Sequence, residues 1–199
     1  MKKSLLALIL AVALVAPVFA QKGDKSINAK LGLGVNNDLS TSYDDMPDGM
    51  GMSIKTEIPA ISLGAEFFYG LMDNLSVGAG ISYGLKANAK EIEGEKPEIG
   101  VTNFYVAVKP EAKIESDIFT SIYLIGQIGG SSVSMEAAGE SRTADMGIYL
   151  GFGAGTIIKD NFIVELLISS SNGSVSEDGM SGDIQYTATT INIGYKFAL

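Results

Sequence analysis

The sequence predicts an all-β protein, an eight-stranded antiparallel up-and-down β-barrel that crosses a membrane. Three observations support this fold class. Apolar residues alternate with small or polar residues in eight segments, which is the period of a strand. After the first twenty residues, no segment has the ~18 consecutive apolar residues that a spanning helix needs, although 46% of the chain is hydrophobic. The connections between the segments are alternately short and long.

The first twenty residues have the organisation of an export signal. Two lysines precede an apolar run at residues 5–15, and Val18-Phe19-Ala20 ends in the small-residue pattern that signal peptidase cuts. We therefore expect a signal peptide at residues 1–20 and one outer-membrane β-barrel domain at residues 21–199.

The eight alternating segments are close to the ~9–11 residues that a tilted membrane strand needs. They cover residues 27–35, 61–69, 75–85, 101–108, 118–129, 147–155, 162–169 and 184–199. The third is the clearest, because Val77, Ile81 and Tyr83 alternate with glycines and serines. In the fifth the two faces are less distinct, since Tyr123 opposes Ile122.

The other segments follow the same pattern. The apolar positions expected to share one face include Ile27, Leu31 and Leu33; Leu63 and Phe67; Phe104 and Val106; Ile148, Leu150 and Phe152; Val164 and Leu166; and Ile191, Ile193, Tyr195 and Phe197. Because successive side chains of a strand point to opposite faces, each segment needs two different environments.

The connections alternate in length. Short turns are predicted at residues 72–74, 110–117 and 159–161. Long polar connections are predicted at residues 36–57, 87–98, 131–145 and 171–183. Short turns at one end and long loops at the other are typical of outer-membrane barrels, so we expect the short turns and both termini in the periplasm.

Alternation alone fits two inverted solutions. A secreted, lipocalin-like barrel places its apolar face inside around a ligand, whereas a membrane barrel places it in lipid. A water-facing set of residues should be rich in charges. The polar face of the first, third and sixth segments is mostly Gly, Ser and Asn, with Lys30 as its one clear charge. Small residues suit the narrow lumen of an eight-stranded barrel, so the membrane solution is favoured.

The hairpin at residues 69–83 resembles those of the small eight-stranded outer-membrane proteins of the OmpX and OmpA-barrel type, and the resemblance covers essentially the whole mature chain. It implies a monomer in the outer membrane of a Gram-negative-type bacterium, in contact with outer-membrane lipids and lipopolysaccharide. In that family the last strand resembles a signal for the barrel-assembly machinery. Tyr195 and Phe197 match the aromatic alternation of that signal, while the chain ends in Leu199, where Phe is usual.

Composition excludes several classes of function. The chain has neither Cys nor His, which removes disulfides, thiolate metal sites and His-dependent catalysis, so we expect no enzyme and no cofactor. Loss of Lys2 and Lys3 with the signal peptide changes the formal charge from -9 to -11, which argues against nucleic acid as a partner. Asp44, Asp45 and Asp48 lack EF-hand spacing, so these acidic residues predict solvated loops rather than a metal site.

Charged residues are expected in the lumen near the periplasmic ends of the strands. They are Lys30, Glu66, Lys109, Glu165 and Lys196. In a closed barrel, Glu165, Lys196, Lys30 and Glu66 would form a row of alternating sign across four neighbouring strands. Paired charges are tolerable in a narrow lumen, whereas unpaired ones are costly. The row predicts an electrostatic plug that fixes packing, or alternatively a gate that opens when the charges re-pair.

Two functions remain open at this point. The first is a structural or surface-interaction role, adhesion-like, in which the long loops meet a host or surface ligand and the lumen is plugged. The alternative is a narrow channel or conduit that carries small solutes or apolar molecules across the outer membrane. Enzymatic activity is a third and weaker hypothesis, since the chain lacks His.

Overall fold

The computed structural model of the chain describes residues 22–43, 52–55, 60–88, 98–114, 116–137, 140–143, 145–177 and 180–199. No helix within these ranges is long and apolar enough to cross a membrane. The predicted signal peptide and the acidic residues Asp44, Asp45 and Asp48 lie outside the described residues.

The described chain is a succession of strands. They are β1 (Lys25–Tyr43), β2 (Met52–Lys55), β3 (Ile61–Met72), β4 (Leu75–Asn88), β5 (Glu98–Lys113), β6 (Phe119–Ala137), β7 (Glu140–Thr143), β8 (Gly147–Ile158), β9 (Phe162–Glu177) and β10 (Met180–Ala198).

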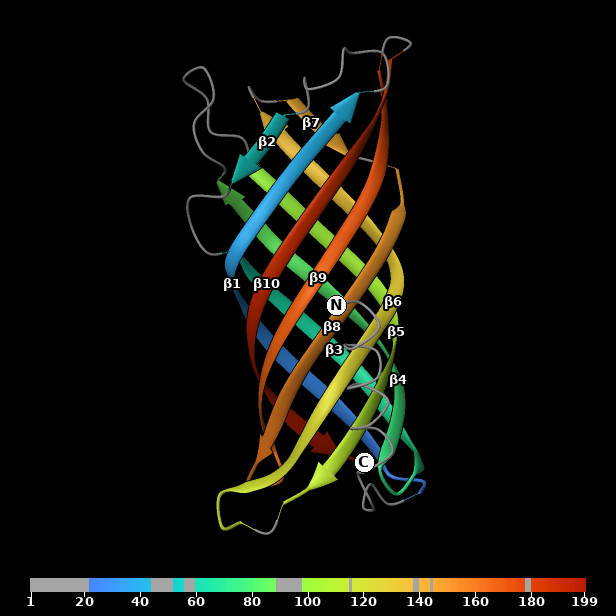
Figure 1. The fold of residues 1–199 in the computed structure, drawn as a ribbon, viewed down its shortest axis with the longest axis vertical. Coiled ribbons are helices and arrows are strands. Elements are labelled where there is room, and N and C mark those ends of the chain that lie inside the picture. The colour runs from blue at the N-terminus through green and yellow to red at the C-terminus, as the bar shows by residue number, and fades with distance from the viewer. Residues whose placement is uncertain are drawn as a thin grey trace, which may run out of the picture.

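Eight long strands form a closed antiparallel barrel (Figure 1). Neighbours in the barrel follow the order β10-β9-β8-β6-β5-β4-β3-β1. The sheet closes because β1 also pairs with β10, from Ser26 opposite Ala198 to Tyr43 opposite Gly182. The two short strands extend hairpins at one end, where β2 pairs with β1 and β7 pairs with β6. The predicted eight-stranded up-and-down barrel is confirmed.

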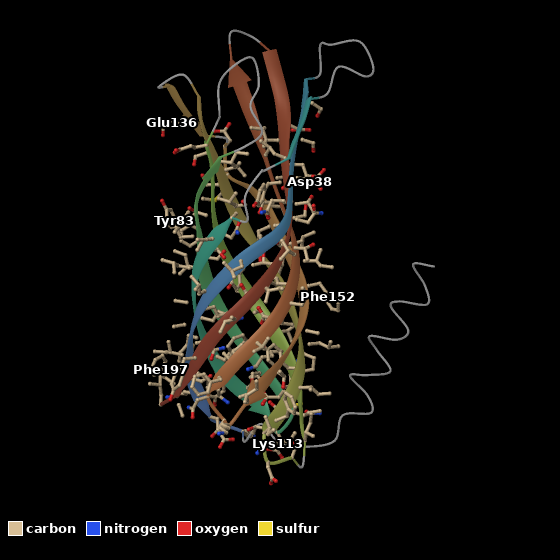
Figure 2. All side chains as sticks on the ribbon, turned by 90° about the vertical axis from the view of Figure 1, so that its left-hand side faces the viewer. Asp38, Tyr83, Lys113, Glu136, Phe152 and Phe197 are labelled. Atoms are coloured by element: carbon tan, nitrogen blue, oxygen red, sulfur yellow. The ribbon has the colours of Figure 1, made fainter. Side chains whose placement is uncertain are left out.

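The lower part of the barrel wall, toward the C-terminus in Figure 1, is apolar outside and polar inside. Leu63 and Ile193 are about half exposed, at 51% and 53%, whereas Glu66 keeps 2% of its surface. Tyr83 and Phe152 also project from the outer wall (Figure 2). A continuous exposed apolar belt is unfavourable in water and matches the hydrocarbon core of a bilayer. The wall therefore has the polarity of a membrane barrel and not that of a lipocalin-like barrel.

The predicted long connections are wrong in their extent. Much of residues 36–57, 131–145 and 171–183 is strand, because β1 continues to Tyr43, β6 continues to Ala137, and β10 already begins at Met180. The physical reason is an inversion of the pattern. Beyond the apolar band, outward-facing residues are polar, while inward-facing residues include the apolar Leu39, Val133 and Ile184. These strand ends therefore lack apolar positions on the outer face and resemble loops in the sequence.

The outward polar residues are most continuous on β9, β10 and β1. Three successive rows of outward positions carry Ser170, Thr187 and Asp38; then Asn172, Gln185 and Ser40; then Ser174, Asp183 and Ser42. We call these nine residues the outer polar face. The residues between them point inward, and Leu39, Ile184 and Tyr186 are buried. This end of the barrel therefore has the polarity of a soluble β-barrel, with its core inside.

The predicted turn at residues 110–117 is also shorter than expected. β5 continues through Pro110 to Lys113, and β6 begins at Phe119. Proline has no N–H to donate to a ladder, so it is confined to strand edges, strand starts and bulges. Pro110 lies opposite Leu75, the first residue of β4, at the end of the β4–β5 ladder. The longer strand brings Glu111 into the lumen, where it is 7% exposed.

Candidate functional site: the charged lumen

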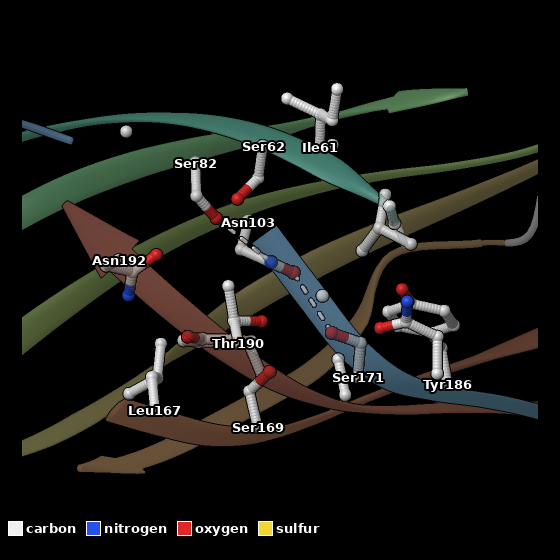
Figure 3. Close-up of a pocket in the computed structure, with 18 of the residues that line it drawn as sticks. Ile61, Ser62, Ser82, Asn103, Leu167, Ser169, Ser171, Tyr186, Thr190 and Asn192 are labelled. Carbon is white, nitrogen blue, oxygen red and sulfur yellow. Dashed lines mark hydrogen bonds between the residues drawn. The ribbon is translucent and has the colours of Figure 1, made fainter. Parts of the chain in front are cut away.

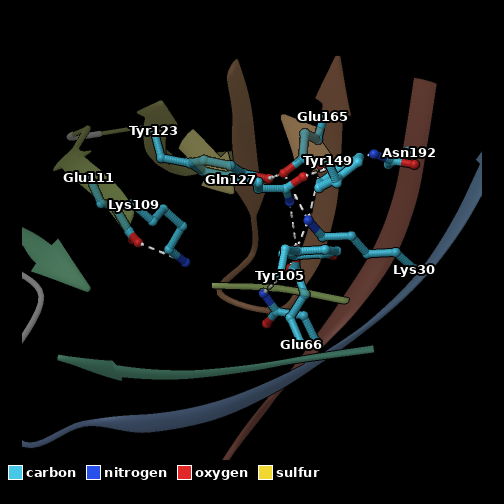
Figure 4. Close-up of polar contacts among 11 residues, drawn as sticks. Lys30, Glu66, Tyr105, Lys109, Glu111, Tyr123, Gln127, Tyr149, Glu165 and Asn192 are labelled. Atoms are coloured by element: carbon cyan, nitrogen blue, oxygen red, sulfur yellow. Dashed lines mark hydrogen bonds and ion pairs between the residues drawn. The ribbon is translucent and has the colours of Figure 1, made fainter. Parts of the chain in front are cut away.

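The chemistry-bearing side chains gather inside the barrel, at the level of the apolar band. Lys30 comes from β1, Glu66 from β3 and Glu165 from β9, so that strands far apart in the sequence meet in the lumen (Figure 4). The register explains this meeting. Asn28 lies opposite Glu66, and Asn192 of β10 lies opposite Glu165, which places both carboxylates on inward positions near Lys30.

Lys30 forms ion pairs with two carboxylates at once. Its Nζ lies 2.8 Å from Glu66 Oε2 and 2.8 Å from Glu165 Oε2. The same Nζ also donates to Glu165 Oε1 at 3.0 Å. The three side chains are almost fully buried, with 6%, 1% and 0% exposure. We call these three residues the lumen triad.

Glu66 accepts hydrogen bonds from three uncharged side chains. Tyr105 Oη donates to Oε1 at 3.0 Å, and Gln127 Nε2 donates to the same oxygen at 3.2 Å. Asn28 Nδ2 donates to Oε2 at 3.3 Å. Tyr149 Oη in turn donates to Gln127 Oε1 at 2.6 Å, which fixes the orientation of that amide. A buried carboxylate with its lone pairs filled is tolerated as an anion.

Glu165 is satisfied in the same way. Tyr123 Oη donates to Oε2 at 3.0 Å, and Asn192 Nδ2 donates to Oε1 at 2.8 Å. Because the two carboxylates are linked through one ammonium group, any displacement of Lys30 would disturb both. Such connected polar groups rigidify an interior when every member is satisfied.

A second ion pair lies closer to the short-turn end. Lys109 Nζ is 3.3 Å from Glu111 Oε2, with 4% and 7% of the side chains exposed. The same ammonium group lies 4.7 Å from the ring centre of Phe68 and 5.2 Å from that of Tyr123, within reach of cation–π attraction. Lys196 is close enough to act electrostatically on both Lys109 and Glu111.

The structure groups the sequence-predicted charges differently from the expected row. Lys30, Glu66 and Glu165 meet directly. The side chain beside Glu165 on β10 is Asn192, while Lys196 lies opposite Asn28, two inward positions further toward the short-turn end. The six lumen charges divide into three lysines and three glutamates, so their formal sum is zero.

Sequence reasoning missed Glu111 and the aromatic residues that hold the carboxylates. Glu111 was assigned to a turn after Pro110, although it has the same strand parity as Lys109. Tyr105 and Gln127 also have the inward parity of their strands, between Phe104 and Val106 and beside the exposed Ile128. Extending the parity of each strand through prolines and aromatic residues would have found them.

Glycines on neighbouring strands make room for these aromatic rings. Gly80 lies opposite Tyr105, and Gly155 lies opposite Tyr123. A Cβ at Gly80 would come within 2.7 Å of the Tyr105 ring, and one at Gly155 would come within 2.5 Å of the Tyr123 ring. The glycines of the inner face therefore match the shapes of the rings that cross the lumen.

Above the triad lies a small cavity of about 80 Å³ (Figure 3). Its wall combines hydroxyl and amide groups with apolar side chains, and Asn103 accepts from Ser171 and donates to Ser82, at 3.1 Å each. The cavity is large enough to hold water.

An apolar cluster lies in the lumen beyond this cavity. It consists of Leu39, Ile99, Val101, Val133, Ile184, Tyr186 and Ala188. Burial raises the pKa of Tyr186 to about 12. The lumen thus has a charged level within the apolar band, where Ile125, Ile157 and Ile163 are also buried, and an apolar level above it.

The terminal residues predicted as an assembly signal lie on the outer face of β10. Tyr195 and Phe197 contact each other with ring centres 4.8 Å apart, and Tyr195 meets Phe162 of β9 edge to face at 5.4 Å. Leu199 is exposed. Within the described ranges no group of three or more His, Cys, Asp and Glu residues could hold a metal ion.

A closed barrel with a lipid-facing exterior and a polar, charged lumen defines a transmembrane β-barrel protein. Residues 5–197 match the family model described as the outer membrane protein beta-barrel domain. The chain therefore belongs to this family of outer-membrane proteins. No protein with a curated description matches it in sequence.

Solved structures agree with the fold. Neisserial surface protein A (NspA) is similar with a TM-score of 0.52 at 11% identity, over 87% of this chain and 97% of that one. The outer membrane protein OprG of Pseudomonas aeruginosa gives a TM-score of 0.50 at 12% identity, over 90% and 98%. Ail, the attachment invasion locus protein of Yersinia pestis, gives a TM-score of 0.45 at 13% identity, over 89% of this chain and 100% of that one. At these identities the likeness shows the fold alone.

Proposed function

We propose that the protein is a non-conducting outer-membrane barrel with a structural or surface-interaction role, plugged by the lumen triad. One observation carries the proposal: a single buried ammonium group of β1 joins a carboxylate of β3 and one of β9 at 2.8 Å each. Opening a path for ions would require these charges to separate in a narrow, weakly hydrated lumen, which is costly. The packed apolar cluster beyond the cavity supports the same role.

The proposal includes an orientation and a route of export. The long hairpins face the outside and are available to a host or surface ligand, while the short turns and the C-terminus lie in the periplasm. The signal peptide is cleaved after Ala20, and Tyr195, Phe197 and Leu199 present the outer face of β10 to the barrel-assembly machinery. The mature protein is a monomer in contact with outer-membrane lipids and has no enzymatic activity, in keeping with a chain that has no His.

Single-channel recording tests the plug. The purified barrel in a planar bilayer should show no steady conductance. Replacing the triad by small side chains, Lys30→Ser with Glu66→Ser and Glu165→Ser, and trimming the apolar cluster with Leu39→Ala, Ile184→Ala and Tyr186→Ala, should create one, because the bulk at both levels of the lumen is then removed.

A matched variant separates bulk from charge. Lys30→Met with Glu66→Gln and Glu165→Gln keeps the side-chain volume and should stay closed. A large, steady conductance of the unmodified protein would contradict the plug and favour the alternative, a narrow channel or conduit.

A further inference from the structure

The outer polar face lies directly next to the lipid-facing apolar band on the same three strands. On β9 the last apolar outward residue is Ile168, and the next outward residues are Ser170 and Asn172. On β10 the outward residues beyond Ile191 are Thr189, Thr187 and others that are all polar. The face is therefore continuous with the surface that contacts lipid.

The chemistry of the face is that of hydrogen bonding without basic side chains. It combines hydroxyl groups with the amides of Asn172 and Gln185 and with two carboxylates, Asp38 and Asp183. None of its nine positions is Lys or Arg, the residues that bind phosphate groups most strongly. Hydroxyls and amides both donate to and accept from the hydroxyl groups of a sugar, and carboxylates accept from them.

The face is held rigid from behind. The inward residues that alternate with it include Leu39 and Tyr186, which are buried in the apolar cluster. Its donors and acceptors are therefore spaced as a sheet spaces them, about 4.8 Å between strands and about 7 Å along a strand. A surface that is already ordered loses little side-chain and backbone freedom when it binds.

We propose that the outer polar face binds the saccharide headgroups of the glycolipid in the outer leaflet. The proposal rests on the proposed orientation, with the long hairpins outside. At a strand tilt of ~40°, three rows rise about 15 Å above the apolar band, which exceeds the ~6–8 Å of an ordinary headgroup region. The face thus passes the phosphate level and reaches the sugars.

Other occupants fit less well. A second copy of the chain would bring Asp38 and Asp183 of both copies against each other. A basic protein would have to penetrate the sugar layer that surrounds the barrel at this height. The saccharide layer is already present there and has the complementary hydrogen-bonding groups.

Reconstitution in two kinds of vesicle tests the proposal. Both contain phosphatidylcholine, with either lipid A or a rough lipopolysaccharide that adds core sugars to the same lipid A. The unfolding midpoint, followed by the gel mobility of folded and unfolded barrel, should rise by about 5 °C with core sugars, the shift that roughly two hydrogen bonds would give. The variant Asn172→Ala with Gln185→Ala and Thr187→Ala should lose most of this rise.

Thr102→Ala with Ser132→Ala is the matched control. These residues pair with each other on β5 and β6, directly above Phe104 on the outer wall. The unfolding midpoint of the control should rise with core sugars by as much as that of the unmodified protein. An equal midpoint of the unmodified protein in both vesicles, or an equal rise in the face variant, would overturn the proposal.

Thiol labelling provides a second measurement that does not depend on the triple variant. The chain has no Cys, so Gln185→Cys introduces a unique thiol. A membrane-impermeant maleimide should label it more slowly with core sugars than with lipid A, whereas an equal rate contradicts binding. Labelling of intact cells checks the orientation separately. A thiol that reacts only after permeabilisation would show that this end of the barrel faces the periplasm. Both the proposed orientation and the proposed saccharide binding would then be wrong.

Discussion

At the scale of single residues, Lys30 determines whether the lumen interior is stable. It is the one ammonium group that contacts both Glu66 and Glu165. Each carboxylate has neutral donors as well, yet neither is left with a second cation at ion-pair distance among the contacts described. Tyrosines, an amide and glycines adjust the shape of this site, but its charge balance depends on one side chain.

Lys30→Met should therefore destabilise the barrel by about 3–5 kcal/mol, because it leaves two buried carboxylates without their cation. Urea unfolding of the protein in phospholipid vesicles measures this loss. Lys25→Met, at an exposed position of the same strand, should change the unfolding free energy by no more than about 0.5 kcal/mol.

A second variant identifies the cause of the loss. Adding Glu66→Gln and Glu165→Gln to Lys30→Met removes the unpaired charges and should restore most of the stability. If the triple variant is as unstable as Lys30→Met alone, the loss comes from packing and not from charge.

At the scale of elements, the β8–β9 hairpin shows how a turn fixes register. Lys159 and Asp160 have positive φ angles of 47° and 67°, which are the dihedral signs of a type I′ turn. Asn161 Nδ2 donates to the carbonyl oxygen of Lys196 at 2.9 Å, so the turn is also attached to β10. A non-glycine residue in this region of φ is strained, whereas glycine is not.

Asp160→Gly should stabilise the barrel by up to about 1 kcal/mol, because it removes the steric cost of a positive φ. The same vesicle unfolding experiment measures the gain. Asp73→Gly, in the β3–β4 turn where φ is not positive, is the control and should be neutral or destabilising. Equal effects of the two substitutions would show that strain at Asp160 is not the cause.

At the scale of the whole molecule, the barrel has two polarities stacked along one axis. The lower part is apolar outside with a charged interior, and the upper part is polar outside with an apolar interior. The strands run through both parts without interruption, and only the pattern of residues changes. The change marks where lipid ends on β9, β10 and β1.

Arginine substitutions on β10 test this boundary. Ile193 lies at the middle of the apolar band, so Ile193→Arg should cost about 2–4 kcal/mol of folding free energy in vesicles. Thr187→Arg, on the outer polar face of the same strand, should cost no more than about 0.5 kcal/mol. Equal costs at the two positions would place both in the same environment and contradict the boundary.

The sequence by itself determined the number of long strands, their antiparallel order and the face of each that meets lipid. Alternation between Ile193 and Asn192, or between Phe67 and Glu66, is a local property that survives in the fold because one face of every strand has to be apolar. Only the tertiary structure decided where the strands end and which charges meet. Ion pairing depends on register and side-chain reach across the lumen, which is why Lys30 joins Glu66 and Glu165. The strand ends could not be located because the outer face of the wall contacts lipid in one part of the barrel and water in the other. The residue pattern of a strand changes at the boundary between these parts.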